Sequence, residues 1–386
     1  MQGFRDRVAI AGIGYTEFSK NSKVSTLTLA TRAIAAAVAD AGLEMDDVDG
    51  LATHRVGDSA LPATVVHALG LRDPKWLLDL FGGGSASHSV VGQAALAIAA
   101  GVADTVVCYR AINARSEFRM GGTGRPLVDA AETQYQAPYG YMAPPQQFAM
   151  MARAHMEKYG TTAEQLGAVA VTQRGHAAMN ERAMMRHPIT LDDYLASRWI
   201  VEPFRLFDCC LETDVAVALV LTSAERARDL QRPSVLIRGI AWGGGFTLYS
   251  SDRPDSTRSA AADLAPRLFE QAGVGPRDID VAELYDCFTY SVLVQLEDYG
   301  FCKKGEGGPF FESGATALGG SIPVNTHGGF LSEGYAHGLN HIAEAVSQLR
   351  GSAADRQVEG AEIALSTSQP GYIAGNTSAL ILRRAP

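Results

Sequence analysis

The sequence predicts an α/β protein made of two related halves. Its 386 residues, 47% of them hydrophobic, are enough for one large buried core or two smaller ones. One succession of strand, helix and glycine turn occurs twice in the chain, at a constant offset of 231 positions. Downstream of each copy, a glycine-rich turn opens a helix that leads to a buried strand. These observations together indicate a duplicated structural unit.

The first copy of the repeat begins with an expected strand at residues 8–13 and an expected helix at about 25–40. The second copy has the same elements, at 235–240 and about 258–271. Each helix is followed by a glycine, Gly42 or Gly273, of the kind that ends a helix in the left-handed conformation. We therefore expect the two copies to fold alike.

The downstream parts of the two copies also correspond. The first has a glycine-rich turn at 82–85, a helix that ends at residue 100 and a strand at 105–109. The second has a glycine-rich turn at 328–338, a helix that ends at residue 350 and a strand at 362–366. Strands that alternate with helices predict largely parallel sheets. We expect an N-terminal half at 1–230 and a C-terminal half at 231–386, packed as one body.

Between about residues 111 and 207 the alternation of strands and helices fails. This stretch is rich in tyrosine and proline and contains helical segments around 146–158 and 163–179. We interpret it as a loop insertion on the first half. A binding loop or lid and a contact in a dimer are both consistent with its composition.

Composition excludes several classes of function. The net charge of −9 argues against a general surface for nucleic acid or anionic lipid. The longest uncharged stretch, at about 82–103, is rich in glycine, serine and alanine and predicts a buried helix, so we expect no membrane span. The short apolar run near the start is interpreted as the first strand rather than a signal peptide.

Cysteine and histidine patterns add two further expectations. The cysteines are odd in number and lack CxxC spacing, which argues against a disulfide framework or zinc ribbon and favours the cytoplasm: Cys108, Cys209, Cys210, Cys287 and Cys302. His327 and His341 lack acidic or cysteine neighbours at metal-ligand spacing, so we expect no metal.

Three motifs carry a resemblance to a known family. They are KYGTTAEQL at 158–166, LFDCCLETD at 206–214 and NTHGGFLSEGYAHG at 325–338. With the duplicated halves, they resemble the thiolase superfamily, and within it the sterol-carrier-protein-X and lipid-transfer-protein branch. The resemblance covers nearly the whole chain. It implies the thiolase fold, in which two βαβαβαββ halves stack as a five-layer αβαβα body.

The residues at the thiolase catalytic positions differ from those of a thiolase. The nucleophilic cysteine of the first-half helix corresponds to Ser85, and His88 is the nearest base for it in the sequence. The family's asparagine corresponds to Tyr285, and the histidine of its GHP motif corresponds to Tyr335. The second catalytic cysteine should fall within 366–370, where this chain has none. Acyl transfer through a cysteine thioester is therefore not expected.

Backbone groups of the thiolase site do not depend on side chains. The N–H groups of Ser85 and Gly371 would still form an oxyanion hole in the thiolase fold. A site that stabilises a thioester enolate without a nucleophile suits retro-aldol cleavage of a β-hydroxyacyl-CoA. We assign Tyr335 as the base toward the β-hydroxyl and Tyr285 as the partner donor or acid, although the two roles could be reversed.

Neighbouring groups could assist the two phenols. His337, Asp286 and Cys287 are candidates to support the tyrosines from close by, with simple packing as the alternative for each. The arginine-containing stretch at 182–186 is the best local candidate for contact with the CoA phosphates, with a solvated surface as its alternative.

Among members of the superfamily, the tyrosine pair is similar to that of the bacterial steroid side-chain aldolases. That resemblance implies an aldolase of steroid degradation and cholesterol catabolism, which releases a ketone and a short acyl-CoA such as propionyl-CoA. It also implies no cofactor beyond the coenzyme A of the substrate, a homodimeric core and a heteromeric complex with a small OB-fold, zinc-ribbon acyl-CoA-associated protein. Two alternatives remain open, a non-catalytic acyl-CoA or sterol-binding scaffold subunit and a residual thiolase that uses Cys287.

Overall fold

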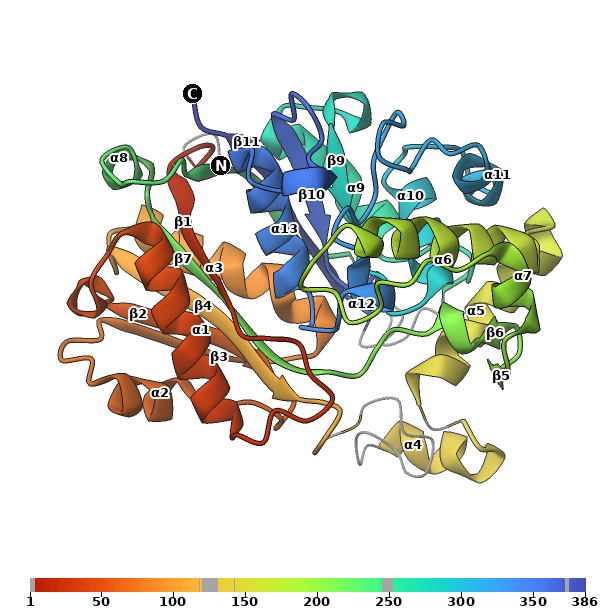
Figure 1. The fold of residues 1–386 in the computed structure, drawn as a ribbon, viewed down its shortest axis with the longest axis horizontal. Coiled ribbons are helices and arrows are strands. Elements are labelled where there is room, and N and C mark those ends of the chain that lie inside the picture. The colour runs from red at the N-terminus through yellow and green to blue at the C-terminus, as the bar shows by residue number, and fades with distance from the viewer. Residues whose placement is uncertain (1–3, 118, 120–130, 142, 245–252, 372–374) are drawn as a thin grey trace.

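The computed structural model describes the whole chain except residues 1–3, 118, 120–130, 142, 245–252 and 372–374. The first half has the predicted βαβαβαββ order (Figure 1). Its elements are β1 (Val8–Tyr15), α1 (Thr26–Ala41), β2 (Gly50–Arg55), α2 (Pro62–Leu69), β3 (Trp76–Phe81), α3 (Ser87–Ala99), β4 (Thr105–Asn113) and β7 (Asp214–Ser223).

The second half repeats this order with its third strand reduced. Its elements are β8 (Val235–Gly243), α9 (Ala261–Ala272), β9 (Val281–Glu283), α10 (Thr289–Asp298), α11 (Gly307–Glu312), α12 (Gly329–Ser332), α13 (Leu339–Arg350), β10 (Ile363–Thr367) and β11 (Thr377–Arg384). In place of a strand that would match β3, a single parallel bridge joins Ala282 to Val324.

The two halves share one sheet order. The nine strands run β3-β2-β4-β7-β1-β8-β11-β10-β9, so that the order outward from β1 in the first half matches the order outward from β8 in the second. The expectation of largely parallel sheets was wrong. β2 is parallel to β3 and β4, and β9 is parallel to β10, but the other five strand pairs are antiparallel. The reason is that β7 and β11, the last strand of each half, enter the sheet without a crossover helix directly before them.

The helices form layers around these strands. α1 contacts β1, β4 and β7 on one face, and α9 contacts β8 and β11 on the opposite outer face. α3 and α13 each contact strands of both halves, so they form the middle layer, which is visible between the two sets of strands in Figure 1. This is the predicted five-layer arrangement.

The local signals of the duplication are confirmed. Gly42 and Gly273 end α1 and α9 with φ of 69° and 66°, a left-handed conformation that residues with a Cβ rarely adopt. Each is followed by a 3₁₀ turn at the predicted offset, Met45–Asp47 and Pro276–Asp278. The boundary that the sequence predicts near residue 230 stays a prediction.

The insertion is mostly helical where the structure describes it. It comprises α4 (Ala131–Gln136), α5 (Pro144–Tyr159), α6 (Ala163–Ala178), α7 (Leu191–Ala196), β5 (Trp199–Val201) and β6 (Phe204–Arg205), and a short helix α8 (Ala224–Ala227) follows β7. α6 contacts α10, α11 and α12, so a segment of the first half packs on the second.

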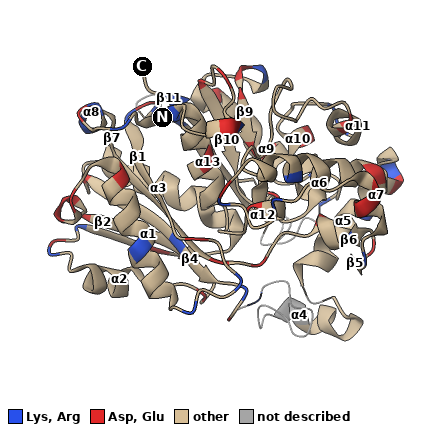
Figure 2. Ribbon diagram, in the orientation of Figure 1, with Lys and Arg blue, Asp and Glu red and all other residues tan. Residues whose placement is uncertain are grey.

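Charge is spread over the outside of the molecule. Figure 2 shows Lys and Arg scattered around the periphery and mixed with Asp and Glu, while most of the strands are free of either colour. Within the described residues, no helix is both long and apolar enough to cross a membrane.

One buried arginine ties the two halves together. Arg350, at the end of α13, contacts Asp40 of α1 at 2.7 Å through Nη1, and its Nη2 donates to the Ala11 carbonyl of β1 at 2.6 Å. Its Nε donates to the Pro233 carbonyl at 2.8 Å. The Arg350 side chain is 4% exposed. Its removal would take a side-chain donor from the Ala11 and Pro233 carbonyls, while Asp40 would keep the Ile13 N–H and Arg232.

We expect Arg350→Met to lower the free energy of unfolding by about 2 kcal/mol, because two carbonyl groups lose a charged donor and Asp40 loses one of its two cations. Urea unfolding followed by circular dichroism measures this change. Arg277→Gln, at an exposed position in a 3₁₀ turn, is the control and should stay within about 0.5 kcal/mol of the parent. Equal stability of the two variants would contradict the role given to Arg350.

Candidate active site

Two predicted residues meet at the centre of the molecule. The hydroxyl groups of Tyr285 and Tyr335 are 2.7 Å apart and hydrogen-bonded to each other. Tyr285 is 1% exposed and Tyr335 is 8% exposed. Phe330 packs edge-on against both rings, with centroid distances of 4.7 and 4.8 Å. The structure therefore brings together the phenols that the sequence placed 50 positions apart.

Tyr285 follows β9, in the short segment that leads into α10. Its backbone N–H donates to Thr367 Oγ1 at 3.0 Å, and its carbonyl accepts from Gln295 Nε2 at 2.8 Å. Thr367 Oγ1 in turn donates to Gln295 Oε1 at 2.6 Å. This closed set of hydrogen bonds fixes the peptide groups from which the ring projects.

Tyr335 lies in the loop between α12 and α13, and one threonine holds its backbone. Thr213 Oγ1 accepts from the Tyr335 N–H and donates to the Tyr335 carbonyl, both at 2.9 Å. Thr213 lies directly before β7, so the first half of the chain positions a residue of the second half. A threonine hydroxyl thus fixes the backbone of each tyrosine.

A glycine turn before α3 closes the site against Tyr285. A Cβ at Gly84 would lie 1.9 Å from Tyr285 Oη, so only glycine leaves room for the phenol. Ser85 follows in this 3₁₀ turn, Gly84–Ala86, and is partly exposed. Ser85 therefore directly follows the residue that packs against the Tyr285 hydroxyl.

Burial controls the ionisation of both phenols. It raises the pKa of Tyr285 well above 10, and the neighbouring Tyr335 and Cys287 raise it further. Burial, and after it Cys210 and Cys287, also raise the pKa of Tyr335 well above 10, but there the hydrogen bond from Tyr285 and the Arg110 cation act in the opposite direction. Tyr335 is therefore the member of the pair whose anion has favourable neighbours.

Sequence reasoning missed a buried charge pair behind Tyr335. Arg110 of β4, whose side chain is fully buried, donates from Nη2 to Asp58 Oδ2 at 2.5 Å. Nε and Nη2 of the same guanidinium lie 3.1 and 2.7 Å from His337 Nδ1. The His337 ring lies 4.8 Å from the Tyr335 ring and 5.6 Å from that of His54. A lone arginine inside an apolar strand was the sequence signal for this cluster.

Two predicted neighbours of Tyr285 have structural partners. Asp286 accepts from the N–H groups of Phe330 and Leu331 at 2.9 and 3.2 Å, and pairs with His341 Nε2 at 3.0 Å. It therefore anchors the start of α12. Burial raises the pKa of the Cys287 thiol well above its usual value, and its Sγ lies 3.7 Å from Ser291 Oγ.

The remaining predicted residues lie around the Ser85 turn. His88 is fully engaged by Ser87 Oγ at 2.9 Å and Ser366 Oγ at 2.7 Å, so the structure gives Ser85 no base in His88. The Gly371 N–H donates to Gln369 Oε1 at 2.5 Å within its own loop. The Ser85 carbonyl accepts from Ser378 of β11 at 2.7 Å, and Gly371 lies in the segment between β10 and β11, six residues before β11 begins.

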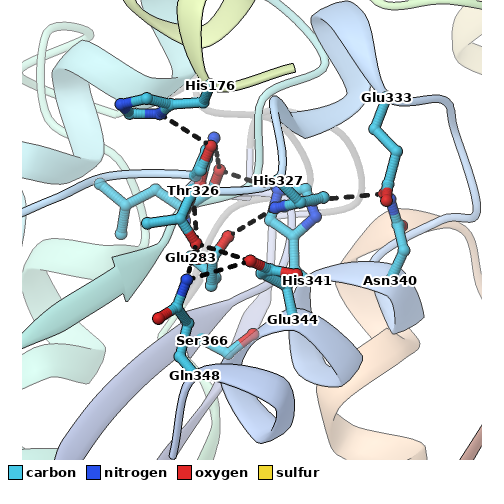
Figure 3. A network of polar contacts seen from close by, with 12 residues as sticks. His176, Glu283, Thr326, His327, Glu333, Asn340, His341, Glu344, Gln348 and Ser366 are labelled. Carbon is cyan, nitrogen blue, oxygen red and sulfur yellow. Dashed lines mark hydrogen bonds and ion pairs between the residues drawn. The ribbon is translucent and has the colours of Figure 1, made fainter. Parts of the chain in front are cut away.

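A buried network of charged groups surrounds His327 and includes Glu333, two residues before Tyr335 (Figure 3). His327 lies 2.9 Å from Glu283 and 3.6 Å from Glu333. Glu333 also accepts from Asn180 and Asn340 at 2.9 Å each. Burial alone would lower the pKa of His327, but Glu333 and Glu283 raise it to about 9. His327 is therefore an imidazolium at neutral pH.

Arginines complete this charged network. Arg356 contacts Glu344 at 3.1 Å, and Arg182 lies 3.6 Å from Glu333 and 3.8 Å from Glu344. Burial raises the pKa of Glu344, but Arg356 and His327 outweigh it and hold that pKa at about 2. Arg182, whose side chain is 40% exposed, also stacks over the ring of Tyr15, so this member of the 182–186 stretch contacts the network from the surface. Across the described ranges, no group of three or more His, Cys, Asp and Glu side chains is arranged to hold a metal ion.

Comparisons with known proteins identify relatives of the whole chain. The family described as thiolase C-terminal domain-like matches residues 246–384. The steroid side-chain-cleaving aldolase of Thermomonospora curvata is 47% identical over 358 residues, which cover 90% of this chain and 91% of that protein. The 17-hydroxy-3-oxo-4-pregnene-20-carboxyl-CoA lyase of Mycobacterium tuberculosis is 45% identical, and the match covers 97% of this chain and 99% of that protein. A solved structure, the Ltp2-ChsH2(DUF35) aldolase, has a TM-score of 0.93 at 45% identity over 99% of both chains.

The His327 network predicts a pH-dependent stability. Because folding raises the pKa of His327 from 6.5 to about 9, its contribution is fully present below about pH 6.5 and is lost as the pH rises through about 9. We expect the stability difference between the parent and His327→Gln to shrink by up to about 3 kcal/mol across this range. Urea unfolding at several pH values measures it. His67→Gln, on an exposed position of α2, should give a flat difference, and a flat difference for His327→Gln as well would contradict the assignment.

Proposed function

The chain belongs to the thiolase superfamily, and from this membership we propose that it is an aldolase that cleaves a β-hydroxyacyl-CoA by a retro-aldol reaction. The observation that carries the proposal is the buried hydrogen bond between Tyr285 and Tyr335 at the two polar positions of a thiolase site. We propose a steroid side-chain CoA thioester as the substrate, because relatives that are 47% and 45% identical are named for steroid side-chain cleavage and for a pregnene carboxyl-CoA lyase.

The reaction needs no external electron acceptor. A base removes the proton of the β-hydroxyl, the β-carbon becomes the carbonyl of a ketone, and the bond between the α- and β-carbons breaks. Its electron pair moves into the thioester, which becomes an enolate, and a proton then adds to the α-carbon to give a short acyl-CoA such as propionyl-CoA. Atoms and electrons balance within the substrate, so the chain needs no cofactor beyond the coenzyme A that the substrate carries.

The surroundings of the phenols support the division of roles between them. Tyr335 is the base, because Arg110 and the Tyr285 hydroxyl favour its anion. Tyr285 is the donor that stabilises this anion and returns the proton, since its own pKa is raised by every neighbour that acts strongly on it. Gly84 brings the Ser85 turn against Tyr285, and this close approach supports an enolate site within reach of the phenols.

The backbone N–H groups of Ser85 and Gly371 would receive the enolate oxygen. The Gly371 N–H donates to Gln369 Oε1, so the substrate oxygen would have to replace this side-chain oxygen. We propose that it does so on binding, since a charged acceptor forms a stronger hydrogen bond than a neutral amide.

A residual thiolase based on Cys287 is the weaker candidate. The thiolate is the nucleophile of such an enzyme, and burial with the Asp286 carboxylate nearby raises the pKa of this thiol. A non-catalytic scaffold would account for the fold, but it gives no reason to bury two phenols on one hydrogen bond.

We further propose a homodimer that binds a small OB-fold, zinc-ribbon partner in the cytoplasm. β3 is the terminal strand of the sheet, and Leu77 and Phe81 on it are 42% and 78% exposed, which suits pairing with a second copy. The solved relative with a TM-score of 0.93 is named for two components. The five free cysteines fit a reducing compartment.

We expect Tyr285→Phe and Tyr335→Phe each to lower the cleavage rate by roughly 10²- to 10⁴-fold, because each removes a proton carrier while keeping the ring. Mass spectrometry of products from a panel of β-hydroxyacyl-CoAs, with and without the OB-fold partner, measures the rate. Tyr299→Phe is the matched control, since Tyr299 is buried and its hydroxyl makes no hydrogen bond within the described part of the chain. Unchanged turnover in both active-site variants would contradict the proposed proton transfer by Tyr285 and Tyr335.

The raised pKa of Tyr335 also predicts the pH profile. Below that pKa the phenolate fraction grows about tenfold per pH unit, so log(kcat/KM) should rise with a slope of about one through the alkaline range. Steady-state assays between about pH 7 and pH 10 measure the slope, with circular dichroism at each pH as the control for folding. A profile that falls above neutral pH while the protein stays folded would exclude a phenolate base.

A further inference from the structure

The position of His337 is conformationally strained. Its backbone has φ of 56°, in the left-handed region, and the residue is 2% exposed. Residues other than glycine are held in this region only where the surroundings enforce it, and such positions cluster at functional sites. His337 is two residues beyond Tyr335, in the same loop, and its ring lies between those of Tyr335 and His54.

Arg110 determines which nitrogen of His337 carries the proton. A guanidinium has only donors, and both Nε and Nη2 of Arg110 lie within hydrogen-bond distance of His337 Nδ1. Nδ1 must therefore be the acceptor, and the ring carries its hydrogen on Nε2. Asp58 accepts from the same Nη2 and holds the guanidinium in place.

The charges around the ring also keep it neutral. Burial lowers the pKa of His337 well below 6.5, and the Arg110 cation and His54 lower it further, while Asp58 acts in the opposite direction. The pKa of His54 is itself lowered to about 3 by burial and by Arg110. Two neutral imidazoles and one guanidinium thus lie behind the phenol pair.

The free edge of His337 faces the glycine turn that leads into Ser85. A Cβ built on Gly83 would lie 3.7 Å from His337 Nε2, while one on the next residue, Gly84, would overlap the Tyr285 hydroxyl. Nε2 and the phenol pair therefore border consecutive residues of the turn that leads into Ser85. Within the described part of the chain, Nε2 makes no hydrogen bond.

We propose that the Nε2–H of His337 donates a hydrogen bond to the thioester oxygen of the substrate as it becomes the enolate, and that Arg110 and Asp58 are positioning residues that set this tautomer. This inference rests on the proposed aldolase function. A neutral donor stabilises the developing charge without giving up its proton, so Tyr285 and Tyr335 remain the proton carriers.

Two substitutions separate the Nε2 donor from the Nδ1 acceptor. The amide oxygen of Asn can take the place of Nδ1 as the acceptor from Arg110, and Asn tolerates a positive φ, so His337→Asn should fold but lack the Nε2 donor. The longer Gln places its amide nitrogen near the Nε2 position. We expect kcat to fall roughly 10²-fold in His337→Asn with KM changed less than about threefold, and to return to within about tenfold of the parent in His337→Gln.

The tautomer is measured without any assay of activity. Long-range ¹H–¹⁵N spectra of ¹⁵N-histidine-labelled protein give the tautomer, and the His337 signals are assigned by their loss in His337→Gln. The ring should have an unprotonated Nδ1 and a protonated Nε2, and this tautomer should persist between about pH 8 and pH 6. Arg110→Met removes the cation next to His337 and leaves the Asp58 carboxylate unpaired. The His337 ring should then become an imidazolium as the pH falls toward about 6. A protonated Nδ1 in the parent overturns the assignment, whether or not Arg110→Met folds.

The outcomes distinguish this inference from the function on which it rests. A parent protein that cleaves no β-hydroxyacyl-CoA contradicts the proposed function. If the parent cleaves the substrate and His337→Asn, shown to be folded by its melting curve, keeps the full kcat, only the donor role of His337 is contradicted. His67→Gln, exposed on α2, is the control and should match the parent in kcat and in melting temperature.

Discussion

The hydrogen bond between Tyr285 and Tyr335 is the constraint on which the rest of the site depends. A buried phenol hydroxyl needs a hydrogen-bond partner, and here the two hydroxyl groups bond to each other at 2.7 Å. The contact exists only because their backbones are fixed by Thr367 and Thr213, which the chain supplies from the ends of different strands. It also requires Gly84, where any side chain would displace the Tyr285 hydroxyl. This one hydrogen bond thus depends on residues from three segments that are distant in the chain, those of Gly84, Thr213 and Thr367.

Around this contact, the buried ionised groups lie apart from the two phenols proposed to transfer protons. The ionised groups, His327 with its glutamates and Arg110 with Asp58, lie behind the loop of Tyr335 and are paired with one another. The groups nearest the phenols are kept neutral or apolar, as Phe330 and His337 are. The proposed base is therefore reached by the field of a cation without direct contact. This arrangement lets one loop be held by strong ion pairs while its tyrosine stays available for proton transfer.

Sequence reasoning recovered the parts of the structure that depend on local rules. The glycines that end α1 and α9 and the constant offset between the copies predicted the duplication, and the family motif placed both tyrosines. Strand direction was missed because β7 and β11 join antiparallel neighbours that hydrophobic patterns cannot identify. The Asp58–Arg110–His337 cluster was missed because its members lie in three segments that only the folded chain brings together. The partners of His88 escaped prediction for the same reason, since Ser366 is 278 positions away.

The central claim is that carbon–carbon cleavage occurs here without a covalent intermediate. Incubation with a β-hydroxyacyl-CoA in D₂O, followed by mass spectrometry of the small molecules and of the intact protein, tests it most directly. The account predicts a ketone, a short acyl-CoA that carries one deuterium on its α-carbon, and a protein whose mass during turnover equals that of substrate-free protein kept in the same D₂O. An acylated protein, or transfer of the acyl group to added coenzyme A, would contradict it.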